Sequence, residues 1–342
     1  MKTKIKQVAQ ILFFFALGVG FIWWFVAKLS EQEISELFES IRRADYFWVI
    51  VAFLISIASC YVRAVRWKQL LKPIGYANVS ISRAFLAIMS GYLTNLAIPR
   101  LGEVIRCACL RKSDAIPVEK TLGTVITERI IDLILFAIIF FVAAILEFSL
   151  IKDYIKTNLD ATIWEKAKTL LLIVAILSAL VIIFVLIARK KIRQTKFFIK
   201  LSSIFAGLWQ GMKSIFHLQK PLLFIFYSFL IWFLWICGTW AVFKCVQSTS
   251  ALGFTAALAV TVLSAFGPMV TPGGIGLYPA IFAQTLLLYG VVKPIGYAAG
   301  WLSWLVSQIA SAVFGLAGFV YFSKNTNNIK NNTANDPLRE TE

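Results

Sequence analysis

The chain has 342 residues, of which 59% are hydrophobic and only 15% are charged. Soluble domains are about half apolar and about one quarter charged, so this composition excludes an ordinary soluble protein and indicates an integral membrane protein. The 34 Lys and Arg outnumber the 17 Asp and Glu, giving a formal charge of +17, but they occur in short clusters between apolar runs, a pattern that directs membrane topology rather than nucleic-acid binding.

The N-terminal part predicts an anchor followed by a surface helix. The first apolar run, residues 8–28, follows three lysines, is long for a secretory signal and lacks an A-x-A-like cleavage site. We therefore expect a retained signal anchor with its N-terminus in the cytoplasm. Next, Ser30 and Glu33 form a capping-box pattern, and apolar residues from Ile34 onward recur at helical spacing. They predict a short interfacial helix on the outer face.

Six apolar segments are long enough to cross a hydrocarbon core of ~30 Å, which needs about 20 helical residues. They lie at 8–28, 46–62, 121–148, 167–188, 221–243 and 296–322. Two further apolar regions, 84–112 and 251–291, are interrupted by proline and glycine. The expected fold class is an all-α polytopic membrane protein with about six full spans and two broken or re-entrant hairpins, roughly eight apolar segments. Either hairpin could instead be two thin crossings, which gives up to ten spans.

Lysine and arginine positions set the expected orientation. Segments 63–83 and 189–220 are basic and expected in the cytoplasm, whereas 29–45, 149–166 and 244–250 are expected outside. With both termini cytoplasmic, the two hairpins must enter from opposite faces. This arrangement predicts a possible inverted repeat with halves at about 1–148 and 165–324, inside one transmembrane domain at 1–324. An apolar stripe within 201–212 is expected on the anionic leaflet, and the Asn-rich tail 325–342 is expected to be disordered.

The span at 121–148 contains three charged residues, Glu128, Arg129 and Asp132. Asp132 lies roughly 16 Å from the start of this span, near the middle of the bilayer. A charge there costs at least about 2.5–3.5 kcal/mol on insertion scales, so each should face a protein or water-filled interior and have a partner. Glu128 and Asp132 share one helix face, whereas Arg129 needs partners on a neighbouring helix.

Both interrupted regions could bind an anion. The first places polar residues around Pro99 and Gly102, namely Asn95, Arg100, Glu103 and Arg106. Broken backbone at membrane depth lines a cavity or packs on protein, and its free amides attract anions. Arg100 and the amides of residues 101–103 are therefore the leading candidates. The second break contains Pro272, Gly273, Gly274 and Gly276, with Thr271 and Tyr278 beside them. Two such breaks in corresponding halves point to a transporter's central site.

A charge count near the expected cavity favours an anionic ligand. Five arginines, Arg63, Arg66, Arg100, Arg106 and Arg129, accompany three carboxylates, Glu103, Glu128 and Asp132. Two positive charges in excess suit a phosphate, which arginine binds with a bidentate fork. We predict that these arginines and Asn95 bind a headgroup anion and that the carboxylates orient them or carry protons. The alternative is a structural ion-pair network, in which Arg63 and Arg66 only snorkel to the cytoplasmic interface.

Other chemistries have little support in the sequence. One histidine, His217, and five cysteines without C-x-x-C spacing give neither a metal site nor a disulfide framework. The chain lacks a nucleotide-binding P-loop motif, so transport would be passive or ion-coupled. We expect no cofactor, no metal and no nucleic-acid partner.

Four stretches, in this order, resemble the flippase-like membrane family related to the transmembrane region of lysylphosphatidylglycerol synthases, over roughly residues 8–324. They are RAVRWKQLL at 63–71, PRLGEVIR at 99–106, TERIID at 127–132 and TPGGIG at 271–276. The resemblance implies an inner-membrane protein that moves a lipid or lipid-linked anion between leaflets, such as an anionic phospholipid or a polyprenyl-phosphate-type lipid. Many relatives carry an acidic residue just after the glycine-rich motif. This chain has Leu277, Tyr278 and Pro279 there, so that residue's role is not transferred.

A lipid translocase without enzymatic activity is therefore the leading hypothesis, and two alternatives remain. The chain has no soluble domain after its last span, so aminoacyl transfer is not expected. An intramembrane enzyme could use Glu128 or Asp132 as a general base, although no nucleophile or metal set accompanies them. An accessory subunit of a lipid-modification or envelope system could use the charges only to hold its helices together.

Overall fold

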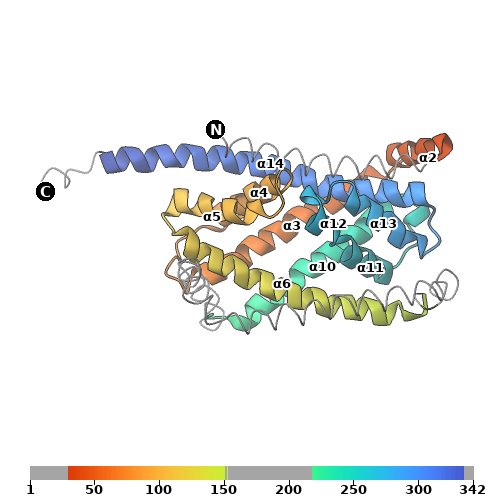
Figure 1. Cartoon of the computed structure of the whole chain (residues 1–342), viewed down its shortest axis with the longest axis horizontal. Helices are drawn as coiled ribbons and strands as arrows, with labels where there is room; N and C mark the ends of the chain where they lie inside the picture. Colours follow the sequence, from red (N-terminus) through yellow and green to blue (C-terminus); the bar gives the residue numbers. More distant parts are fainter. Residues whose placement is uncertain (1–29, 151, 153–217, 335–342) are drawn as a thin grey trace, which may run out of the picture.

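The computed structural model describes residues 30–150, 152 and 218–334, which form helices without strands (Figure 1). The spans predicted at 8–28 and 167–188 and the stripe at 201–212 lie outside these residues. Four of the described helices are long and apolar enough to cross a membrane, which confirms the other four predicted spans. They are α3 (Tyr46–Leu71), α6 (Val118–Leu146), α10 (Pro221–Cys245) and α14 (Lys293–Ala334).

Two of these helices are longer than the sequence pattern predicts. Helix α3 continues past the predicted end at 62 to Leu71, because the first helix breaker after the apolar run is Pro73. Arg63 and Arg66 are thus part of a helix rather than of a cytoplasmic loop. Helix α14 continues to Ala334, although disorder was predicted from 325 onward. Its polar extension contains neither glycine nor proline, and adding residues to an existing helix costs much less than starting one.

Both interrupted regions fold as short helices. The first contains α4 (Ile81–Asn95) and α5 (Leu101–Asp114), and the second contains α11 (Phe254–Ser264), α12 (Gly267–Val270), η3 (Pro272–Gly274) and α13 (Leu277–Leu287). At 1.5 Å per residue, α4 is about 22 Å long and α11 about 16 Å, both shorter than the hydrocarbon core of ~30 Å. These lengths favour hairpins over thin crossings.

The two hairpins lie toward opposite ends of the bundle (Figure 1). Buried apolar residues of α4 and α5 pack with Trp67 near the end of α3 and with Phe322 on α14. At the other end, Leu37 of α2 (Glu31–Arg42) packs on Ala280 and Ala283 of α13. This arrangement agrees with entry from opposite faces, and the internal symmetry stays a prediction.

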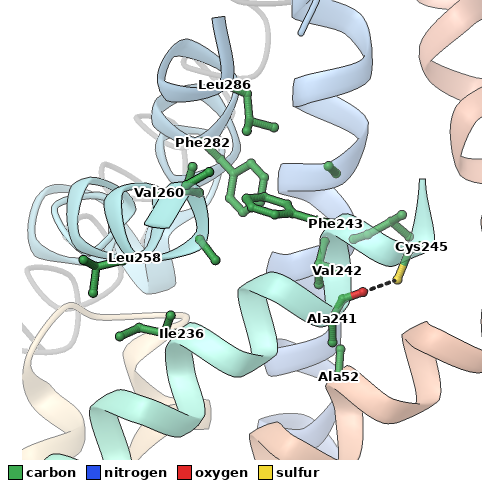
Figure 2. Close-up of a cluster of buried hydrophobic side chains, with 14 of the residues drawn as sticks. Ala52, Ile236, Ala241, Val242, Phe243, Cys245, Leu258, Val260, Phe282 and Leu286 are labelled. Carbon is green, nitrogen blue, oxygen red and sulfur yellow. Dashed lines mark hydrogen bonds between the residues drawn. The ribbon is translucent and has the colours of Figure 1, made fainter. Parts of the chain in front are cut away.

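The main core joins the second hairpin to the spans. Figure 2 shows Phe243 of α10 beside Phe282 of α13, with ring centroids 6.1 Å apart at an interplanar angle of 78°. Val260 of α11 and Ala52 of α3 belong to the same buried cluster. Edge-to-face aromatic pairs of this kind add about 0.5–1.5 kcal/mol to the burial term. This packing fixes the second hairpin against α10.

Helix α2 begins as the sequence predicts. The Ser30 backbone N–H donates to Glu33 Oε2 over 2.8 Å, and the Glu33 N–H donates to Ser30 Oγ over 3.2 Å. These two bonds form the predicted capping box. Leu37 is the buried residue of α2, and it packs against residues of α13 and α14.

Close backbone contact holds the first hairpin together. A Cβ added at Gly102 of α5 would lie only 1.9 Å from the Gly91 carbonyl oxygen of α4. A Cβ added at Gly91 would lie 2.6 Å from the Gly102 carbonyl oxygen. The two helices therefore touch through main-chain atoms at this crossing, which only glycine permits.

Candidate functional site

The described helices contain a cluster of ion pairs between α3, α5 and α6. We call it the charge cluster, and its members are Arg63 and Arg66 of α3, Glu103 and Arg106 of α5, and Glu128, Arg129 and Asp132 of α6. Arg63 and Arg66 are three residues apart on α3, and Glu128 and Asp132 are four apart on α6. Each pair thus lies on one side of its helix, where it can face the other pair.

Arg66 is the centre of the charge cluster. Its Nη1 lies 2.7 Å from Asp132 Oδ1, and its Nη2 lies 3.4 Å from Glu128 Oε1. Nη1 also donates to Ser228 Oγ of α10 over 3.1 Å. Its side chain is 0% exposed. One guanidinium therefore connects three membrane-spanning helices.

The other two buried arginines combine an ion pair with an aromatic contact. Arg63 Nη2 lies 3.3 Å from Asp132 Oδ2, and its guanidinium carbon is 5.2 Å from the centroid of the Trp235 ring. Arg106 Nη2 lies 2.8 Å from Glu128 Oε2, and its guanidinium carbon is 4.7 Å from the Trp67 ring. Aromatic faces attract cations, most strongly where water is excluded. Arg63 and Arg66 are both buried, so the alternative in which they snorkel to the cytoplasmic interface is wrong.

As predicted from the sequence, Arg129 pairs with a residue on a neighbouring helix. Its Nε lies 2.5 Å from Glu103 Oε1 of α5, and its Nη1 lies 3.7 Å from Asp132 Oδ2. Unlike the other arginines of the cluster, Arg129 has a side chain that is 39% exposed, and Glu103 is 28% exposed. This pair forms the accessible edge of the charge cluster.

The backbone amides of the first break are already occupied. Gly102 N–H donates to the Asn95 side-chain oxygen over 2.8 Å, so Asn95 binds the hairpin itself. The N–H of Leu101 donates to the Ile98 carbonyl oxygen and that of Glu103 to the Arg100 carbonyl oxygen. The expectation that these three amides are free to bind an anion is therefore wrong, since a side chain and the preceding turn satisfy them.

Arg100 lies outside the charge cluster. Its side chain is exposed and forms no ion pair within the described part of the chain. Its backbone is left-handed, with φ 65°, an uncommon conformation for a residue other than glycine. The cluster therefore contains four arginines and three carboxylates. Its excess is one positive charge, rather than the two predicted from the sequence.

The second break supports the structure rather than supplying charge. The N–H of Gly274 donates to the Thr271 carbonyl oxygen and that of Ile275 to the Pro272 carbonyl oxygen, both over 3.1 Å. Trp304 Nε1 of α14 donates to the Gly273 carbonyl oxygen over 2.8 Å. The amides of Gly274 and Ile275 are therefore not free to bind an anion.

The tips of the two hairpins meet in the interior. Gly273 has φ 55°, and a Cβ added there would lie 2.4 Å from Leu96 Cδ2 of the first hairpin. Leu96 follows the last residue of α4, so this contact joins the two breaks. The breaks are thus adjacent, as a shared central site requires, although only the first hairpin contributes to the charge cluster, through Glu103 and Arg106 of α5.

Sequence reasoning missed several residues that support the cluster. Ser228 accepts from Arg66, and Trp67 Nε1 donates to Thr124 Oγ1 over 2.9 Å while its ring faces Arg106. The spacing of Arg63, Arg66 and Trp67 along one side of a continued helix is the signal that could have identified this face. The position of α10 beside it could not be obtained from that spacing.

Comparison with known proteins gives a family match over nearly the whole chain. The profile of the family described as "Lysylphosphatidylglycerol synthase TM region" matches residues 8–320. UPF0104 membrane protein MJ1595 from Methanocaldococcus jannaschii is 23% identical, with 92% of this chain and 95% of that protein aligned. UPF0104 membrane protein PH1989 from Pyrococcus horikoshii is also 23% identical, over 89% of this chain and 93% of its own length. No solved structure matches the chain.

Proposed function

Because the chain belongs to the family of the lysylphosphatidylglycerol synthase TM region, we propose that it is a translocase without enzymatic activity, which moves a lipid or lipid-linked anion across the inner membrane. Both termini would be cytoplasmic, and transport would be passive or coupled to an ion. The transported molecule would be an anionic phospholipid or a polyprenyl-phosphate-type lipid, recognised through its phosphate.

The observation that supports this proposal is a buried excess of positive charge with unused donors. Within the described residues, Nε of Arg66 and Nε of Arg106 have no hydrogen-bond partner, although both atoms are buried. Buried N–H groups are rarely left without an acceptor, and the cluster carries one more arginine than carboxylates. A phosphate would supply both the missing negative charge and the acceptor oxygens.

The cluster divides the roles among its members. Arg63, Arg66 and Arg106 would hold the headgroup anion, and Arg129 would meet it first. Glu128 and Asp132 would orient the arginines, each from two or more sides.

The test is movement of labelled phosphatidylglycerol and phosphatidylcholine between leaflets of proteoliposomes, with and without a proton gradient. Asp132→Asn is expected to fold, because asparagine keeps an acceptor oxygen for Arg66. It is expected to move the anionic lipid at least about tenfold more slowly, since Arg63, Arg66 and Arg129 lose a shared counter-ion; tenfold corresponds to about 1.4 kcal/mol in the barrier. Glu39→Gln, at an exposed pair on α2, is the control.

An accessory role is the second candidate, because every carboxylate of the cluster already has an arginine partner. In that role the charges hold α3, α5 and α6 together and bind no ligand. Asp132→Asn would then lower thermal stability without a separate loss of lipid movement. The wild-type protein itself would move neither lipid. Selective movement of the anionic lipid by wild type, lost in a folded Asp132→Asn variant, excludes this second candidate.

A further inference from the structure

The pair formed by Arg129 and Glu103 lies inside the membrane by counts along two helices. Along α6, Arg129 is about 12 Å from Thr121, where the apolar run begins; along α5, Glu103 is about 12 Å from Arg111, the first of the charged residues that end the helix. Three residues connect α5 to α6, so both counts start from the same side. Half of a hydrocarbon core of ~30 Å is about 15 Å, so the pair lies within the core on the side where α5 and α6 are connected.

An exposed ion pair at this depth needs a polar partner. Charges at the centre of a bilayer are costly unless they face protein, water or a polar ligand. The ion pairs of Arg63, Arg66 and Arg106 are buried, whereas the Arg129–Glu103 pair is 39% and 28% exposed. Apolar side chains surround it on the same two helices, and Leu133 is 64% exposed. Charge next to an apolar surface matches a lipid, with its phosphate beside its acyl chains.

The contact between the two side chains is close but poorly aligned. Arg129 Nε lies 2.5 Å from Glu103 Oε1, yet this approach does not have the geometry of a hydrogen bond. A guanidinium binds best through two parallel N–H groups to two oxygens, which a phosphodiester can offer. Asp132, 3.7 Å from Arg129 Nη1, would keep the guanidinium in place during an exchange.

The fold also provides for a released Glu103. This residue is in the first turn of α5, where the helix dipole favours negative charge. Its side chain is partly exposed, so it can turn away from Arg129 without entering the buried core. The carboxylate can therefore leave the guanidinium.

We propose that Glu103 is a displaceable counter-ion, which the phosphodiester of an anionic lipid replaces on Arg129, and that it limits how tightly the protein binds such lipids. This inference rests on the proposed function for its ligand class and adds the residue that sets affinity. A structural role for Glu103 predicts weaker lipid binding when the carboxylate is lost. A displaceable counter-ion predicts tighter binding.

The experiment measures phosphatidylglycerol bound to the full chain in phosphatidylcholine nanodiscs, titrated by mole fraction and counted by mass spectrometry. Glu103→Gln is expected to bind about twofold to fivefold more tightly, the range for losing competition from a partly exposed ion pair. Arg129→Gln should bind at least about tenfold more weakly, and Glu103→Asp should resemble wild type. Glu39→Gln removes the carboxylate of an exposed Glu–Arg pair on α2 and is the matched control.

Three results would overturn the inference. In the first, Glu103→Gln binds phosphatidylglycerol more weakly or as wild type does, while Arg129→Gln still binds it more weakly. Glu103 would then only position Arg129, and the proposed function would stand. Unchanged binding in both variants would exclude this site. Equal competition by inorganic phosphate or glycerol 3-phosphate would identify a soluble anion rather than a lipid. Conversely, tighter binding in Glu103→Gln without movement of any lipid in proteoliposomes would contradict the proposed function and leave the site intact.

Discussion

Replacement of Arg66 by glutamine is expected to lower the free energy of unfolding by about 3–5 kcal/mol, the usual cost of breaking a buried ion pair from one side. Arg66 is fully buried and contacts Asp132, Glu128 and Ser228. Its loss leaves Glu128 with Arg106 alone and removes the closest contact of Asp132. Thermal unfolding in detergent, followed by tryptophan fluorescence, measures this effect.

A matched control and a double variant make this result interpretable. Arg43→Gln removes an arginine from an exposed pair with Glu39 and is expected to change stability by no more than about 1 kcal/mol. Arg66→Gln combined with Glu128→Gln should be less destabilised than Arg66→Gln alone, because fewer buried charges stay unpaired. Equal destabilisation of single and double variants would show that packing, not charge, makes Arg66 important.

Replacement of Gly102 by alanine is expected to destabilise the first hairpin by about 3 kcal/mol or more, at the upper end of the range for overpacking. The added Cβ would lie 1.9 Å from the Gly91 carbonyl oxygen and 2.7 Å from the Asn95 side-chain oxygen. Backbone cannot yield as a flexible side chain does, so α4 and α5 must separate. Because α5 carries Arg106 and Glu103, the lipid movement that we propose should be lost as well.

Gly238→Ala in α10 is the matched control for Gly102→Ala. A Cβ added there would lie 3.7 Å from Ile55 Cγ2, an ordinary contact. It should leave stability unchanged or raise it by up to about 1 kcal/mol, since alanine favours helix more than glycine does. If Gly102→Ala unfolds at the same temperature as Gly238→Ala, the close crossing of α4 and α5 is wrong.

Spans and caps could be predicted from local pattern because their causes are local. Apolar length predicts α6 and α10 within a few residues, and Ser30 with Glu33 predicts the start of α2. The C-terminal end of α3 was harder to predict, because the basic residues from Arg63 onward suggested a cytoplasmic loop. Burying Arg66 is tolerable only because α6 supplies two carboxylates, a tertiary effect that hydropathy does not contain.

The site was predicted in part. The depth of Glu128 and Asp132 in an apolar run was enough to predict that both have partners. Which arginines would reach them depended on packing between segments more than sixty residues apart, for example Arg66 and Asp132. Arg100 was misplaced because the direction of a side chain at a break depends on one unusual backbone conformation, here φ 65°.

The contact between Leu96 and Gly273 affects how the tips of the two hairpins can move. The tip of each hairpin fills space beside the other, and Trp304 fixes Gly273 to α14. Close-packed groups cannot shift singly by more than a fraction of an ångström without opening a void or a clash. We therefore expect rearrangements of the two tips to be concerted, so that probes placed at the two ends of the protein report a single relaxation time rather than two.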